Sequence, residues 1–237
     1  MQKEISFNVY VPSYKRYDDK LRIYDYLEYC TYVVRKSEEE LYRQFGIDNL
    51  WVVDDCHIDN IHKVHDYIIK NSPEDVICII DDDGKMIYRM EDTRDMTKEE
   101  ASLELERIGQ MLSDLKLGFA CTEANPAPFY YTGEFAFKGM CGGCKWINKS
   151  CFKAKIDDKC MYNFDLDLEL QELLTNRIVL KPLYFVDIGG QDTNKGGSNE
   201  DKNKEKRMSG IMHTKNKWGR YFDYNFTNNK ARINVKR

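Results

Sequence analysis

The sequence predicts an α/β fold, with a mostly parallel central sheet flanked by helices and a smaller antiparallel portion. Strand-like and helix-like segments alternate over residues 6–80, which is typical of a parallel sheet wrapped by helices. The segment 76–80 is apolar throughout, as expected of a strand that is buried on both faces. Polar loops follow three of the predicted strands, at the edge where sheets of this kind bind ligands.

The first half of the chain supplies four predicted strands and two predicted helices. The strands are expected at residues 6–12, 30–35, 50–53 and 76–80. A capping box, with Ser37 as N-cap and Glu40 three residues later, predicts a helix to about Phe45, which Gly46 ends. Apolar residues at helical spacing predict a second helix from Ile58 to about Lys70.

The second half is predicted to be more mixed. A short strand is expected at 85–90, and a second capping box, Thr97 to Glu100, begins a helix that continues to Lys116. Residues 118–140 are interpreted as loop and antiparallel strand, whose aromatic rings are expected to pack rather than to bind substrate. The remaining elements are a helix that begins at Phe164 and a strand over 180–186.

The composition indicates a globular protein that contacts no membrane. Hydrophobic residues make up 42% of the 237 positions, and the apolar runs are far shorter than the ~20 residues of a membrane span. The N-terminus moves directly into a strand pattern, without an apolar signal segment, so we expect a cytoplasmic protein. The eight cysteines are then expected to be reduced. Zinc binding by Cys141, Cys144, Cys151 and Cys160 is left open, because only the first two have paired spacing.

The charge is unevenly distributed along the chain. Residues 202–237 contain eleven lysines and arginines against two acidic residues, although the net charge of the whole chain is −4. A basic segment on an acidic body predicts a polyanionic partner, either the phosphates of a nucleotide or a nucleic-acid backbone. A solvated terminal extension is the alternative. We expect a single domain over residues 1–220 and a basic C-terminal extension over 221–237.

Three consecutive carboxylates, Asp81, Asp82 and Asp83, follow the apolar segment 76–80 directly. Like charges at this spacing repel one another, and each is costly to bury. A divalent cation such as Mn²⁺ or Mg²⁺ removes this difficulty and also binds a diphosphate. The triplet therefore predicts a metal-dependent nucleotide-sugar site, with a solvated turn as the alternative reading.

Other polar segments are expected at the same edge of the sheet. The loop after the first strand offers a hydroxyl, an aromatic ring and two cations, which suit a nucleotide base and its phosphates; it comprises Pro12, Ser13, Tyr14, Lys15 and Arg16. Asp54 ends the third strand. Because the carboxyl ends of parallel strands lie along one edge, we expect these groups and the aspartate triplet to converge on a bound nucleotide.

Three further groups complete the predicted site. Asp165 and Asp167 open a helix; they either favour its dipole or orient and deprotonate an acceptor hydroxyl. Lys195, with Gly196 and Gly197, lies in a glycine-rich segment that could close over phosphates. His213 is a candidate third metal ligand.

Six segments that occur in order resemble the TET-associated glycosyltransferases, which are found largely in bacteriophages. These segments are residues 9–16, 32–40, 79–83, 164–167, 193–197 and 217–219. The resemblance implies a GT-A fold, with Asp81 and Asp83 in an Asp-x-Asp metal motif and Asp83 as the direct ligand. It places Asp81 or Asp82 nearer the ribose, residues 12–16 at the donor nucleotide and Lys195 over the diphosphate.

The resemblance also implies an activity. Members of this family glycosylate hydroxymethylated or hypermodified pyrimidines in phage DNA, so we expect a UDP-sugar as donor, DNA as acceptor and the host cytoplasm as location. The sequence departs from the family at His65–Asp66, where the family carries an Arg–Asn pair. A transferase that acts on a glycan or protein, and a nucleic-acid-binding protein without catalytic activity, are the alternative functions.

Overall fold

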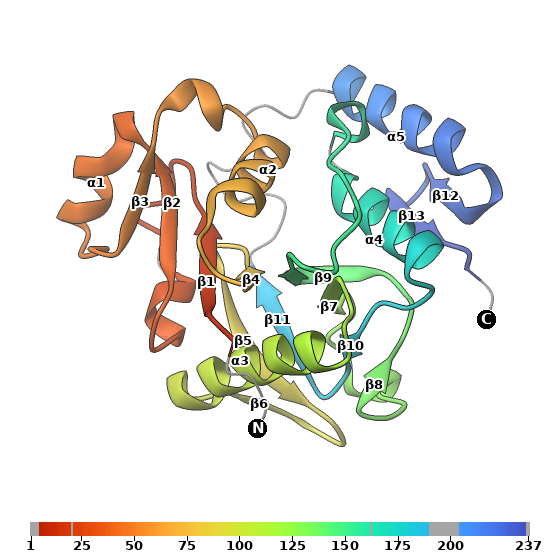
Figure 1. Ribbon diagram of the computed structural model, residues 1–237, viewed down its shortest axis with the longest axis horizontal. Coiled ribbons are helices and arrows are strands. Elements are labelled where there is room, and N and C mark those ends of the chain that lie inside the picture. The colour runs from red at the N-terminus through yellow and green to blue at the C-terminus, as the bar shows by residue number, and fades with distance from the viewer. Residues whose placement is uncertain (1–4, 20, 162, 190–203, 236–237) are drawn as a thin grey trace.

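The computed structural model describes residues 5–19, 21–161, 163–189 and 204–235. Its centre is a six-stranded sheet in the order β3-β2-β1-β4-β9-β7 (Figure 1). Strands β1 to β4 are mutually parallel, whereas β9 runs antiparallel to both of its neighbours. The predicted α/β fold with a mostly parallel sheet is therefore confirmed. The strands are β1 (Phe7–Pro12), β2 (Thr31–Arg35), β3 (Leu50–Val53), β4 (Val76–Ile79), β7 (Phe119–Glu123) and β9 (Cys141–Asn148).

Helices cover both faces of this sheet. One face packs against α3 (Lys98–Asp114), and the other against α2 (Ile61–Asn71) and α4 (Phe164–Thr175). Along β4 the side chains alternate, so that Cys78 faces the α3 side and Ile77 and Ile79 face the α2 side. All four residues of β4 are buried, which confirms the predicted strand with two covered faces.

Smaller antiparallel sheets complete the fold. Strands β11 (Phe185–Gly189), β5 (Gly84–Arg89) and β6 (Thr93–Asp95) form one of them, in which Gly84 pairs with Gly189. β8 (Phe135–Ala136) pairs with β10 (Lys181–Pro182). Because β5 follows the aspartate triplet directly and β11 runs beside it, these strands bring residues near 187 to the edge where β4 ends.

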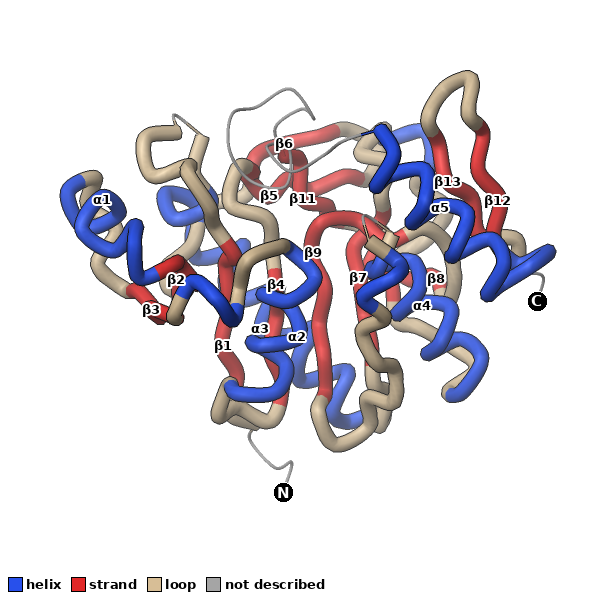
Figure 2. The backbone as a smooth tube through the Cα atoms, turned by 90° about the horizontal axis from the view of Figure 1, so that it is seen from above, coloured by secondary structure: helices blue, strands red, loops and turns tan. Residues whose placement is uncertain are grey.

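The C-terminal part of the chain lies beside α4. Helix α5 (Lys204–Trp218) and the hairpin of β12 (Phe222–Asn225) and β13 (Lys230–Ile233) gather there, at the side of the molecule away from α1 (Glu39–Gln44) (Figures 1 and 2). Phe222 and Tyr224 are buried with Ile211 of α5 against α4. Within the predicted extension 221–237, residues 222–233 therefore form an ordered hairpin with its own apolar contacts. None of the described helices has the length and apolar character of a membrane span.

The two predicted capping boxes have different outcomes. Thr97 and Glu100 form the predicted reciprocal hydrogen bonds at the start of α3. The prediction for Ser37 is wrong, because its hydroxyl donates to Asp55 after β3 and the N-cap position of α1 is Glu38. The side chain of Ser37 therefore joins the ends of β2 and β3 instead of capping a helix.

Candidate active site at the carboxyl end of β4

The aspartate triplet and the loop after β1 meet, as predicted. β1 and β4 are adjacent parallel strands, so the residues that follow them emerge side by side. The hydroxyl of Ser13 donates to Asp82, and a guanidinium nitrogen of Arg16 lies 2.7 Å from Asp82 Oδ1 and 2.8 Å from Asp83 Oδ2. Tyr42 of α1 adds a hydrogen bond of 2.7 Å to Ser13. These contacts fix the loop on the end of β4.

Asp82 acts here as the anchor of the loop. Asp82 is only 7% exposed. One of its carboxylate oxygens accepts a hydrogen bond from Ser13, and the other accepts one from Arg16. Burial raises the pKa of Asp82 to about 7, against the opposing effects of Arg16 and Ser13. The side chain predicted to bind the donor thus holds the protein's own loop.

Asp81 has the opposite environment. It is exposed, and its carboxylate makes no hydrogen bond or ion pair with another described residue. Loss of hydration beside the surrounding protein raises the pKa of Asp81 to about 6. The negative charges of Asp187, Asp83 and Asp165 act in the same direction, while Lys145 lowers the pKa. Asp81 is therefore the member of the triplet that is available to a cation or a ligand.

Asp187 of β11 is a site residue that the sequence analysis missed. It accepts hydrogen bonds from the backbone N–H groups of Gly143 and Cys144, at 3.0 and 3.1 Å, and from the hydroxyl of Thr122. An oxygen of Asp187 and one of Asp81 both lie within 3.0 Å of the position that a Cβ on residue 143 would take. Glycine at position 143 thus allows two carboxylates from distant segments to converge.

A buried lysine faces this acidic group. Lys145 of β9 is 5% exposed, and its ammonium donates to the carbonyl oxygen of Gly143 at 3.1 Å. Burial alone lowers the pKa of Lys145, but the charges of Asp81, Asp165 and Asp187 outweigh burial and raise it. Lys145 therefore remains protonated and adds a buried positive charge near these carboxylates.

The structure separates the roles of the two predicted catalytic aspartates. Asp165, in the first turn of α4, is partly exposed and close enough to Asp81 and Lys145 to influence the pKa of both. Asp167 is fully buried and accepts from Lys217 at 2.9 Å and from the indole of Trp218 at 2.7 Å. Asp165 is brought to the site, whereas Asp167 joins α4 to α5.

A pocket of about 780 Å³ lies beside the loop after β1. In the wall of this pocket, the guanidinium carbon of Arg35 lies 3.7 Å from the centre of the Tyr14 ring. Asp19, which also lines the pocket, lies 4.0 Å from Arg16. Arg16 thereby connects the pocket to the triplet. The lining residues are Tyr14, Lys15, Tyr17, Asp18, Asp19, Arg35, Ser37, Glu38, Leu41 and Asp55.

Of the described residues predicted to bind the donor, Tyr14 and Lys15 line this pocket, whereas Pro12, Ser13, Arg16, Asp54, Asp81 and Asp82 do not. Pro12 is buried as the last residue of β1. Asp54 is exposed and lies 3.7 Å from Lys36, whereas its neighbour Asp55 faces the pocket. Lys195, Gly196 and Gly197 lie outside the described residues.

Neither His213 nor His65 makes a hydrogen bond or ion pair with Asp81, Asp82 or Asp83 in the part of the chain that the structure describes. His213 is on α5, with Nε2 3.2 Å from Asp157, and none of the contacts among the described residues connects it to Asp81 or Asp83. His65 is buried on α2, with its ring centre 4.8 Å from that of Phe164.

The carboxylates are suited to a hard divalent cation that is shared with a ligand. Two groups of possible metal ligands occur among the described residues, and neither includes the triplet. Mg²⁺ and Mn²⁺ do not require a complete protein cage, because they are commonly bound by one or two carboxylates together with phosphate oxygens and water. Asp81, whose carboxylate has no hydrogen bond or ion pair within the described part of the chain, and Asp83 beside it fit this requirement.

No protein-family model matches the sequence, and no curated protein matches it. Among solved structures, the chain is similar to the crystal structure of S. aureus TarS 1-349, with 12% identity and a TM-score of 0.45 over 76% of this chain. The match spans 59% of that chain. It is also similar to UDP-glucose pyrophosphorylase complexed with UDP-glucose, with 8% identity and a TM-score of 0.42 over 90% of this chain and 99% of the other. Membership of a family stays a prediction.

Proposed function

We propose that the protein is a metal-dependent glycosyltransferase that moves a sugar from a nucleotide-diphosphate donor to a hydroxyl group. The convergence of Asp81, Asp187 and Asp165 around the buried Lys145, beside a large pocket, carries this proposal. An exposed carboxylate, a fixed cation and an acidic helix start together provide the charges that diphosphate binding and sugar transfer require.

The pocket is proposed to hold the nucleoside of the donor. Its volume falls in the range of about 300–1,000 Å³ that is usual for ligand sites. The Tyr14 ring offers an aromatic surface to a base, and the carboxylates of Glu38 and Asp19 can accept hydrogen bonds from ribose hydroxyls. Arg16 then directs the diphosphate toward the end of β4, because it lies between the pocket and the triplet.

The remaining residues are assigned to the transfer itself. A Mn²⁺ or Mg²⁺ ion held by Asp81 and Asp83 would supply positive charge to the diphosphate leaving group. Lys145 adds a second, permanent positive charge, and its burial strengthens its electrostatic effect. Asp165 orients the acceptor hydroxyl and accepts its proton, since it is partly exposed and faces the same charges.

The acceptor is proposed to be a hydroxyl on a modified pyrimidine in DNA. Exposed cations on α5, in the turn that follows it and on the β12–β13 hairpin support this, including Lys206, Arg220, Lys230 and Arg232. Transfer that requires DNA and weakens steeply with salt is expected. Transfer to a glycan or protein that proceeds equally well without DNA would overturn this part of the proposal and leave the donor chemistry intact.

Thermal unfolding in the presence of nucleotide sugars tests the donor site. A panel of nucleoside-diphosphate sugars is added with and without Mn²⁺, and a ligand at about one hundred times its Kd stabilises the fold by about 2.7 kcal/mol. We expect at least one UDP-sugar to raise Tm only when the metal is present. Asp81→Asn should abolish this shift, and Asp48→Asn, in an exposed turn before β3, should retain it. An unchanged shift in Asp81→Asn would refute the metal assignment.

A further inference from the structure

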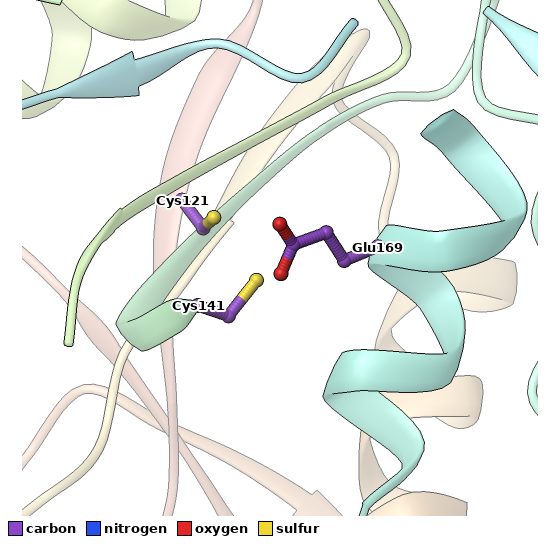
Figure 3. Close-up of side chains that lie close together, drawn as sticks. All are labelled: Cys121, Cys141 and Glu169. Carbon is purple, nitrogen blue, oxygen red and sulfur yellow. The ribbon is translucent and has the colours of Figure 1, made fainter. Parts of the chain in front are cut away.

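A second group of possible ligands lies within the core. Cys121 of β7, Cys141 of β9 and Glu169 of α4 direct one sulfur, one sulfur and one carboxylate toward a common point (Figure 3). The three ligand atoms all lie within 4.8 Å of one another. All three residues are buried, and they come from three different elements.

The carboxylate of Glu169 is the unusual member of this group. Glu169 is fully buried, and neither of its carboxylate oxygens has a hydrogen-bond partner among the described residues. The thiol and the N–H of Cys141 face it without the geometry of a hydrogen bond. Buried carboxylates without donors are costly, and burial raises the pKa of Glu169 to about 7; a bound cation would remove this cost and keep the carboxylate ionised.

We propose that Cys121, Cys141 and Glu169 form a zinc site. Thiolate sulfur and carboxylate oxygen are both ordinary zinc ligands, at about 2.3 Å and about 2.0–2.2 Å from the metal, and ligand atoms this close together need only small shifts to meet one ion. Three protein ligands leave one coordination position for a water molecule. The two cysteines come from adjacent strands, so sequence spacing alone does not indicate the site.

The charges around the cluster are compatible with a bound dication. The ammonium of Lys181 is fully buried nearby and donates to the carbonyl oxygens of Thr122 and Met140. The charged groups at the cluster are Glu169 and Lys181, and Lys181 also lies 3.8 Å from the carboxylate of Glu123. When Zn²⁺ replaces the two thiol protons, the net charge of the buried group is unchanged, so occupation requires no further counter-ion.

The position of the cluster also indicates what the metal does. Glu169 is one helical turn after Asp165, so both side chains lie on the same face of α4. A metal shared by β7, β9 and α4 would fix this helix to the sheet. The metal would thereby position the acidic first turn of α4, and it is distinct from the proposed Mn²⁺ site at Asp81.

The other group of possible ligands does not share these properties. Asp157, Cys160 and His213 also lie close together. However, Asp157 is already 2.9 Å from the ammonium of Lys217 and 3.2 Å from His213, so its charge is neutralised by protein groups. Cys160 therefore provides a control cysteine from a cluster that is not expected to bind zinc.

The test uses the metal content and the Co²⁺ spectrum of the full-length protein. We expect the purified protein to contain one equivalent of zinc, and Co²⁺ added after removal of zinc by a chelator to give a sulfur-to-cobalt charge-transfer band. The carboxylates at Asp81 cannot produce this band, so the result is independent of the proposed transferase activity. Absence of both zinc and the band in the unmodified protein would overturn the proposal.

Substitutions then locate the site. Cys121→Ser and Cys141→Ser should each lose the zinc and weaken or abolish the band, and Glu169→Gln should lower the affinity for Co²⁺ at least tenfold. Cys160→Ser should retain both the zinc and the band. Loss of the band in Cys160→Ser, with retention in Cys121→Ser, would assign the metal to the other cluster and refute the proposal. Because the unmodified protein is tested first, a variant that fails to fold does not leave the proposal undecided.

Discussion

Replacement of Gly143 by alanine tests the geometry of the candidate active site directly. The added methyl group would enter the space that the carboxylates of Asp81 and Asp187 occupy. The side chain of Asp187 would have to move, and its 3.0 Å hydrogen bond from the N–H of residue 143 would be lost. The substitution therefore forces apart two carboxylates that belong to distant segments, without removing either of them.

The expected magnitude follows from these contacts. A hydrogen bond to a charged acceptor contributes about 1.5–3 kcal/mol, and an added methyl in a tightly packed position costs about 1–3 kcal/mol. We therefore expect Gly143→Ala to lower the free energy of unfolding by about 2.5–6 kcal/mol. We also expect it to abolish the Mn²⁺-dependent rise in Tm with a UDP-sugar, because Asp81 and its surroundings are displaced.

Gly189→Ala is the matched control for this experiment. It adds the same methyl group at the same edge, but its Cβ would meet only Asp83 Oδ1, at 3.3 Å, as its nearest neighbour. Urea denaturation should show a loss of less than about 1 kcal/mol for this variant. If Gly143→Ala unfolds at the same urea concentration as the unmodified protein and keeps the ligand-dependent shift, the convergence of Asp81 and Asp187 at residue 143 is refuted.

Two further predictions concern the anchor of the loop after β1. Arg16→Met should destabilise the protein by about 3–5 kcal/mol in urea, because it leaves Asp82 and Asp83 buried without their cation. Arg22→Met, which breaks a more exposed pair with Asp25, should cost less than about 1 kcal/mol, and equal losses would contradict the assignment. Stability should also depend on pH. Burial raises the pKa of Asp82 to about 7, above the ~3.9 of an unfolded aspartate, so the folded state binds the extra proton between these values. The free energy of unfolding should therefore fall as the pH rises from about 4 to about 7, and Asp82→Asn should flatten this slope. An unchanged slope would show that Asp82 does not titrate there.

The four parallel strands of the central sheet could be predicted because their signals are local. The apolar segment 76–80, the predicted end of the second helix near Lys70 and the capping box at Thr97 each report on a few adjacent residues, and the structure reproduces them. The meeting of Asp82 with Ser13 and Arg16 was also predictable, because adjacent parallel strands end at one edge. In both cases a short segment and one topological rule were sufficient.

Asp187, Lys145 and the Cys121–Cys141–Glu169 cluster could not be predicted in the same way. Asp187 directly follows the last predicted strand, 180–186, and is separated from Asp81 by more than one hundred residues, so the pairing of β11 with β5 is what brings it to the site. Helix α5 was missed as well. Its buried residues are few, Gly210, Ile211 and Thr214, and do not form a recognisable apolar stripe.

Strand β9 explains why the two proposed sites depend on one another. Its alternate residues Cys141, Gly143 and Lys145 share one face, since Cys144 and Trp146 pack on the opposite, α3 side. On α4, Asp165 influences Lys145 while Glu169, one turn later, faces Cys141. The strand and the helix thus approach one another through two pairs of side chains. Lys145 and Asp165 belong to the candidate active site, and Cys141 and Glu169 belong to the buried cluster. A metal that fixes Glu169 to Cys141 would also fix Asp165 relative to Lys145, so loss of the buried site should weaken the active site even though no active-site residue has changed.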